Sequence, residues 1–211
     1  TMAKTMVGEG TDYEELTIVD GIELAVEEYG IAFRNGSNLV SAVNEAYEEL
    51  LEDGTLAAIA EKYDLTYSLI TDPVPSEESG TSDEDDLAYV KEKGTLIIGI
   101  TEYAPMNYYD ESGKLVGFDT EFAEAVCEKL GVTPEFVVID WNTKVVELAS
   151  KNIDCIWNGM TILDDLKENL DFSAAYMRNK QVLVVKDGFD ISIVAEAGSA
   201  GENSVKDLMA E

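Results

Sequence analysis

GTLIIGIT (94–101), GFDTEFAEAVCEKLG (117–131) and PEFVVID (134–140) follow one another along the chain, and these three stretches decide the fold. The first and third are short apolar runs rich in β-branched residues, a pattern typical of buried strands. The middle stretch carries apolar residues at helical spacing, with Asp119 as the expected N-cap and Gly131 as the expected end. The order predicts a strand, a helix and a second strand.

The next stretches repeat this alternation. NTKVVELASKN (142–152) has the spacing of a helix, and IDCIWNG (153–159) is typical of a third strand. This order predicts an α/β fold with a parallel sheet and right-handed crossovers. Because ligands of such sheets bind beyond the carboxyl ends of the strands, the candidate pocket lies at Thr101–Pro105, Asp140–Trp141 and Asn158–Thr161.

An earlier part of the chain, EYGIAFRNGSNLVSAVNEAYEELLEDGTLAAIAEKYDL (28–65), has the pattern of a strand, a turn and two helices. Asn35 and Gly36 form the turn signal, and Ser37 is the expected cap of the first helix. TDPVPSEESGTSDEDD (71–86) combines prolines, small polar residues and an acidic run. That composition predicts a solvated linker.

Composition excludes several classes of function. Lys+Arg 14 against Asp+Glu 44 gives a formal charge of −30, which repels nucleic acids and anionic membranes. The absence of histidine removes Ser-His-Asp and Cys-His catalysis and the usual zinc sites. Cys127 and Cys155 fall in apolar patterns, so two buried free thiols are expected rather than a disulfide. We expect neither a membrane span nor a signal peptide in this sequence, which fits a mature exported protein and a cytosolic one alike.

Several stretches carry a family resemblance: LAYVKEKGTLIIGITEYAPMNYYDESGKLVGFDTEFAEAVCEKLG (87–131), IDCIWNGMTILDDLKENLDFSAAYMRNKQVLVV (153–185), EAGSAGE (196–202), EEYGIAFRNGS (27–37) and EELLEDGTLAAIAEKY (48–63). They resemble the extracytoplasmic solute-binding proteins of polar amino-acid ABC transporters. The resemblance implies a two-lobed periplasmic-binding-protein-like fold, with parallel-rich sheets flanked by helices and a ligand between the lobes.

The order of the segments differs from that family. There, a segment like 28–65 closes the chain and one like 87–101 opens it, so the resemblance implies a circular permutant or a fragment across two tandem copies. A helix–strand unit of the second lobe has no counterpart here, so this lobe is expected to be incomplete, and a second chain could complete it. The expected division is second lobe 1–28, a C-terminal-type strand and helices 29–70 packed on the first lobe, linker 71–86, first lobe 87–178 and second lobe 179–211.

The resemblance also assigns a ligand site. It implies aromatic walls at two positions, a glycine and a threonine that receive the ligand's ammonium and carboxylate groups, and a helix N-terminus in the second lobe. The expected ligand-binding residues are Tyr103, Trp141, Asn158, Gly159, Thr161, Leu166, Ser199, Ala200 and Gly201. The residues themselves leave open that Tyr103 and Trp141 are core aromatics and that Thr161 only caps a helix.

Leu166 stands where the family has an arginine that grips the ligand's α-carboxylate by two parallel hydrogen bonds. Losing one partner of such a desolvated ion pair costs on the order of 3–5 kcal/mol. With apolar Leu163 nearby, aromatic Tyr103, Trp141 and Trp157, and an acidic surface, the site is expected to suit a cationic or apolar amine better than an α-amino acid.

The sequence therefore predicts a non-enzymatic solute-binding protein that closes over a small molecule, an amino acid or an organic amine, about hinges near Ala25–Tyr29 and Tyr176–Lys180. No cofactor or metal is expected. The resemblance implies an extracytoplasmic location and, if the protein is natural, an ABC transporter permease as partner. The permuted order also fits an engineered binder or sensor scaffold. The alternatives are an ordinary polar amino-acid-binding component, a dehydratase-like enzyme on the same fold, and an interaction module that has lost its ligand.

Overall fold

The computed structural model of the chain describes residue 3, residues 6–74 and residues 85–189. It contains two compact units. One is Glu28–Arg178, and the other comprises described residues before Glu28 and after Arg178. The chain passes between them at Glu27 to Glu28 and at Arg178 to Asn179. Both passages fall within the two segments that the sequence analysis gives as hinges.

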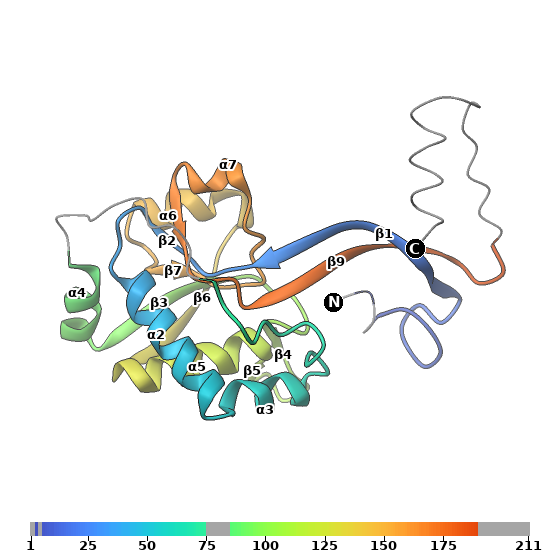
Figure 1. Ribbon diagram of the computed structural model, residues 1–211, viewed down its shortest axis with the longest axis horizontal. Helices are drawn as coiled ribbons and strands as arrows, with labels where there is room; N and C mark the ends of the chain where they lie inside the picture. The colour runs from blue at the N-terminus through green and yellow to red at the C-terminus, as the bar shows by residue number, and fades with distance from the viewer. Residues whose placement is uncertain (1–2, 4–5, 75–84, 190–211) are drawn as a thin grey trace. The chain divides into compact units, whose positions relative to one another are not determined.

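The unit Glu28–Arg178 is built around a five-stranded mixed sheet with strand order β6-β3-β7-β2-β8 (Figure 1). β3 pairs parallel with β6 and β7, as predicted, whereas β2 pairs antiparallel with β7 and β8. β2 precedes the predicted linker, so the segments on both sides of the linker share one sheet. The strands are β2 (Ala32–Arg34), β3 (Thr95–Ile100), β6 (Thr133–Val138), β7 (Cys155–Ile156) and β8 (Leu170–Phe172).

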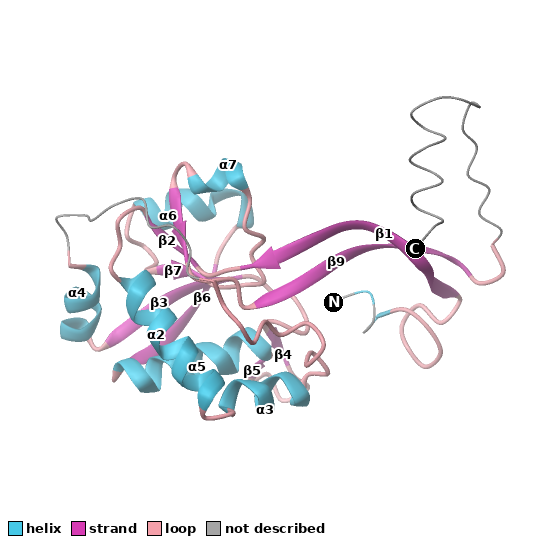
Figure 2. Ribbon diagram, viewed as in Figure 1, coloured by secondary structure: helices cyan, strands magenta, loops and turns pink. Residues whose placement is uncertain are grey.

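Helices cover both faces of this sheet (Figure 2). In β3, Ile98 belongs to one hydrophobic cluster and Ile97 packs against the other, because successive strand residues point to opposite faces. α2, α3, α4 and α5 supply the first cluster, and α6 supplies the second. The helices are α2 (Leu39–Glu52), α3 (Thr55–Lys62), α4 (Asp86–Lys93), α5 (Phe118–Leu130), the short η1 (Trp141–Thr143), α6 (Lys144–Ala149) and α7 (Asp164–Lys167), and a small hairpin pairs β4 (Tyr108–Tyr109) with β5 (Leu115–Val116).

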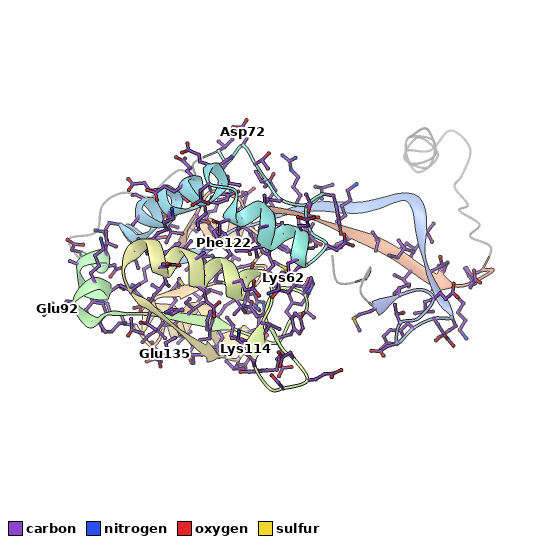
Figure 3. The ribbon with its side chains drawn as sticks, turned by 90° about the horizontal axis from the view of Figure 1, so that it is seen from below. Lys62, Asp72, Glu92, Lys114, Phe122 and Glu135 are labelled. Carbon is purple, nitrogen blue, oxygen red and sulfur yellow. The ribbon has the colours of Figure 1, made fainter. Side chains whose placement is uncertain are left out.

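Aromatic side chains fill the core between α5 and the sheet. Phe122, labelled in Figure 3, lies 5.5 Å from Tyr47 on α2 and 4.9 Å edge-on from Trp157, measured between ring centroids. Trp157 is fully buried. The expectation that Trp157 offers its ring to a cationic ligand is therefore wrong, since both of its faces belong to the interior.

Two predicted helix caps are displaced. α5 is capped by Gly117, whose φ of 130° is reserved for glycine and whose Cβ position would lie 2.2 Å from the Met106 carbonyl oxygen. Asp119 lies inside the first turn and is fully buried. At α2 the cap is Asn38 rather than Ser37. The predicted end at Gly131 is confirmed, with the left-handed φ of 74°.

The end of the predicted linker is part of the fold. Asp85 caps α4 by accepting a hydrogen bond from the Ala88 N–H at 2.9 Å. Asp86 is buried and forms an ion pair with Arg34 at 3.1 Å, while Ser37 donates a hydrogen bond to the same carboxylate oxygen at 2.7 Å. Residues 75–84 lie outside the described residues. The contacts of Asp86 join the chain before the linker to the chain after it.

In the other unit, β1 (Leu16–Tyr29) and β9 (Met177–Lys186) form a two-stranded sheet, and both strands continue into Glu28–Arg178. Asn179 and Gln181 of β9 donate side-chain hydrogen bonds to Glu27 of β1, at 3.1 and 2.5 Å. The strand predicted at 181–186 is confirmed as part of β9. The final strand, turn and helix of the prediction lie outside the described residues.

The two cysteines behave as predicted. Cys127 and Cys155 are free and buried. Burial raises the pKa of the Cys127 thiol to about 12, with a further contribution from Glu124. In the part of the chain that the structure describes, no helix has the length and apolar character needed to cross a membrane. Nor do three or more potential metal-ligating side chains gather there.

Candidate functional site

A hydrogen-bond network fixes the loop that follows β7. The Asn158 side chain accepts a hydrogen bond from the Thr101 hydroxyl at 2.5 Å and donates to the Thr101 carbonyl at 2.9 Å. It also donates to the Asn107 side chain at 2.7 Å, and Asn107 in turn donates to Thr120 on α5 at 3.1 Å. Buried Asn158 thereby holds the carboxyl ends of β3 and β7 together, at the edge of the sheet where the sequence predicts a ligand.

Gly159 lies between two tyrosine rings. A Cβ atom at this position would lie 3.1 Å from ring atoms of both Tyr29 and Tyr103 and 3.3 Å from Met106. The φ of Gly159 is +55°, a conformation that other residues adopt only with strain. The two tyrosine hydroxyls are 3.3 Å apart. The backbone at Gly159 therefore comes close to two tyrosine rings, which requires a glycine.

The Gly159 N–H points away from solvent. It donates to Oδ2 of Asp119 at 2.6 Å, and the Tyr176 hydroxyl donates to the same oxygen at 2.9 Å. Oδ1 of Asp119 has no hydrogen-bond partner among the described residues. Burial raises the pKa of the Asp119 carboxyl to about 7, although its two hydrogen bonds act in the opposite direction.

The same loop is attached to β1 through its backbone. The Met160 carbonyl accepts a hydrogen bond from the Gly30 N–H at 3.0 Å, and the Ile162 N–H donates to the Glu28 carbonyl at 2.9 Å. Between these bonds Tyr29 and Thr161 form an antiparallel bridge. Thr161 is not a helix cap, because the cap of α7 is Leu163. Residues 158–162 are thus held against the point where β1 enters the unit.

Trp141 and Leu166 pack against a different hydrophobic cluster from Tyr29 and Tyr103. Both are partly buried and pack against the second hydrophobic cluster, the one that contains Met160. The ammonium group of Lys144 lies 4.7 Å from the centroid of the Trp141 ring and donates to the Trp141 carbonyl at 3.1 Å. One face of Trp141 therefore carries a lysine cation.

The remaining predicted positions are Leu163 and three residues of the expected second lobe. Leu163 is 51 % exposed, so it is not a core residue. Ser199, Ala200 and Gly201 lie outside the described residues. The structure brings Tyr103, Asn158, Gly159 and Thr161 into one loop region with Tyr29, which the sequence analysis names only as the end of a hinge segment. Tyr29 lies 74 residues from Tyr103 along the chain, so its place beside Tyr103 depends on the tertiary structure. The only signal in the sequence that could have suggested Tyr29 as a site residue is its position where a strand meets a loop.

What the loop offers chemically is a set of binding groups. Tyrosine rings attract apolar groups and cations through their faces. The Asn158 carbonyl points away from Asp119, because the N–H of the same trans peptide points toward Asp119. Thr161 is partly buried. Aromatic rings, a backbone carbonyl and a threonine at the carboxyl ends of parallel strands are groups of the kind that bind small molecules.

The chain belongs to the bacterial extracellular solute-binding proteins of family 3, whose pattern matches residues 96–210. It is 38% identical over 108 residues to the L-cystine-binding protein TcyJ of Escherichia coli K12, covering 51% of this chain and 41% of that protein. It is 32% identical over 129 residues to the arginine-binding extracellular protein ArtP of Bacillus subtilis 168, covering 56% of this chain and 50% of that protein.

Among solved structures, a polar amino acid ABC uptake transporter substrate binding protein from Streptococcus thermophilus is 34% identical, with a TM-score of 0.40. The match covers 42% of this chain and 34% of that one. The chain thus spans half or less of the length of these relatives. The two curated relatives are named as binding proteins, not as enzymes.

Proposed function

We propose that this chain forms part of a non-enzymatic solute-binding protein in which Glu28–Arg178 supplies one face of the ligand site. The observation that carries the proposal is the Gly159 peptide, which lies between Tyr29 and Tyr103 and is fixed by Asn158 and Asp119. A backbone held in one conformation by buried side chains is pre-organised to bind.

The proposed mechanism is hinge closure. The loop 158–162 is attached to the entering strand at Glu28–Gly30, and Tyr176 of the leaving segment bonds Tyr29 through its N–H at 2.9 Å. A ligand bound at this loop stabilises the closed state if it makes more contacts in that state than in the open one. The proposal includes the permuted segment order, an extracytoplasmic location and an ABC transporter permease as partner.

We propose an organic amine as the ligand, because Leu166 offers no charge for a carboxylate and packs against apolar side chains. The alternative is an α-amino acid, which the names of the relatives favour. The Lys144 cation beside Trp141 supports this alternative, because it repels an ammonium group and attracts a carboxylate. The two ligand classes differ in one group, the carboxylate.

A pair of ligands that differ only in that group provides the test. L-arginine and agmatine differ by one α-carboxylate, and L-cystine and cystamine differ by two. Titration calorimetry and melting curves with each pair should show tighter binding and a larger rise in Tm with the decarboxylated member. Tighter binding of the amino acid would establish the alternative. No binding by any of the four, under conditions where the chain is folded, would count against the proposed function for both ligand classes.

A matched pair of variants locates the site. Tyr103→Ala should weaken binding by roughly 1–3 kcal/mol, because it removes an aromatic face beside Gly159. Tyr109→Ala removes the same side chain from an exposed position on the nearby hairpin, and should leave binding unchanged. Equal effects of the two substitutions would contradict the placement of the site.

A further inference from the structure

We infer that Asp119 is a positioning residue whose carboxylate aligns the Gly159 peptide with the ligand and ties this loop to Tyr176, so that ligand affinity follows the charge of Asp119. The inference rests on the proposed function, in which residues 158–161 face the ligand. Asp119 itself is fully buried and touches no ligand. It acts through the two groups that donate to its Oδ2 atom, the Gly159 N–H and the Tyr176 hydroxyl.

The bond to Gly159 sets the direction of a carbonyl. In a trans peptide the N–H and C=O point in opposite directions, so fixing the Gly159 N–H on Asp119 turns the Asn158 carbonyl away from Asp119. Glycine is free to adopt other φ values once the bond is lost. The Asp119 carboxylate thus selects the conformation in which this carbonyl points away from Asp119 and the Gly159 α-carbon lies beside the rings of Tyr29 and Tyr103.

The bond to Tyr176 joins the loop to the segment that leads out of the unit. Tyr176 lies three residues before Asn179, where the chain passes into the other unit. Its N–H donates to the Tyr29 carbonyl at 2.9 Å, and Tyr29 belongs to the segment that enters the unit. Through these bonds, Oδ2 of Asp119 connects the candidate ligand loop with the segment that enters Glu28–Arg178 and with the segment that leaves it.

The surroundings of Asp119 make its charge state changeable near neutral pH. Among the described residues, no cation contributes to the shift of its pKa. The titratable groups around it are tyrosines: Tyr176 bonds it directly, and Tyr29 and Tyr103 flank Gly159. Glu121, on the same helix, bonds Lys62 and Tyr63 instead. Oδ1 has no partner, so a proton there finds no acceptor among the described residues.

The direction of the effect follows from these contacts. Burial raises the pKa of Asp119 to about 7, so the carboxylate and its charge-assisted hydrogen bonds are present above this pH and are lost below it. If only the ionised form binds, the apparent affinity at pH 6 is about tenfold weaker than at pH 8, in proportion to the competent fraction.

The first experiment needs no ligand. In the full chain labelled with 15N-glycine, the Gly159 amide resonance should titrate with a midpoint near pH 7. It should not titrate in Asp119→Asn, which keeps an acceptor oxygen but has no charge to lose. In Tyr176→Phe the midpoint should rise, because a hydrogen bond that favours the charged carboxylate is removed. Asp154→Asn, a buried carboxylate at the opposite end of β7, should leave the titration unchanged.

A Gly159 resonance that is constant between pH 5 and 9, or that titrates alike in the wild type and in Asp119→Asn, would overturn the inference. So would an unchanged midpoint in Tyr176→Phe, since a purely structural role of the tyrosine would not move it. These readouts hold whether or not any ligand binds, so failure of the proposed function is distinguishable from failure of this inference.

The second experiment measures affinity against pH with L-arginine and agmatine as probes. Whichever probe binds should bind about tenfold less tightly to the wild type at pH 6 than at pH 8. Asp119→Asn should show one pH-independent affinity, while Asp154→Asn should retain the wild-type profile. A probe that binds the wild type and Asp119→Asn with the same pH profile would overturn the link between Asp119 and the ligand.

Discussion

The buried carboxyl of Asp119 makes a prediction about stability that is separate from binding. Its folded-state pKa is about 7, against 3.8 for the ordinary group, and desolvation is the main cause. The folded state therefore holds the proton more tightly than the unfolded chain does. The contribution of Asp119 to the stability of the fold is most favourable below pH 3.8, becomes less favourable as the pH rises toward 7, and is constant beyond that.

The magnitude follows from the shift. One pKa unit corresponds to about 1.4 kcal/mol, so a shift of about three units costs on the order of 4 kcal/mol of unfolding free energy between pH 4 and pH 8. Asp119→Asn keeps the size of the side chain and removes this dependence. It leaves an amide donor at the position of the unpartnered Oδ1 atom, which adds a cost of roughly 1–3 kcal/mol at every pH.

The assay is urea unfolding of the wild type and of Asp119→Asn from pH 4.5 to pH 8.5, followed by the fluorescence of buried Trp157. Added salt should be held constant, because the net charge of −30 changes over this range in both proteins. The difference in unfolding free energy should move in favour of Asp119→Asn as the pH rises. A constant difference across the range would refute the argument that desolvation raises the pKa of this carboxyl.

Four other changes test the site and the domain organisation. Trp141→Ala should weaken ligand binding by roughly 1–3 kcal/mol with little change in Tm, whereas a lower Tm with unchanged affinity would make Trp141 a core residue. Leu166→Arg should favour L-arginine over agmatine by up to about 3–5 kcal/mol, and a lower Tm with no change in preference would contradict the pocket interpretation. Arg34→Met should lower the unfolding free energy by about 3–5 kcal/mol, because Asp86 stays buried without its cation. Adding Asp86→Asn in the same chain should recover part of this loss. If the losses of unfolding free energy of the two single variants simply add in the double variant, the ion pair is contradicted. A short Gly/Ser insertion within residues 75–84 should leave Tm nearly unchanged, and loss of folding would contradict the linker prediction.

Local sequence was sufficient for most of the elements around the site. β3 and α5 follow from apolar runs at the spacing of a strand and of a helix, and Gly131 ends α5 because a left-handed residue there favours glycine. The parallel pairing of β3, β6 and β7 follows from their alternation with helices. The two buried cysteines follow from the same apolar patterns.

Other features depended on contacts between distant parts of the chain. Nothing local indicates that β2 enters the sheet between β7 and β8, because strand pairing depends on the faces that other elements leave to be covered. Trp157 has the sequence neighbours of a site aromatic, yet its ring packs edge-on against Phe122 in the core. A ring at the end of a strand can serve either role, and the packing of α5 decides which.

Asp119 shows the difference most directly. An aspartate near the start of a helix has the local pattern of an N-cap, and that was the interpretation of the sequence. Gly117 takes that role because it alone fits against the Met106 carbonyl, so the Asp119 carboxyl is free to bond Gly159 and Tyr176. These partners are 40 and 57 residues away along the chain. The sequence by itself determined that an acid would stand at the start of α5, and only the tertiary structure decided that burial would raise its pKa and direct it at the candidate ligand loop.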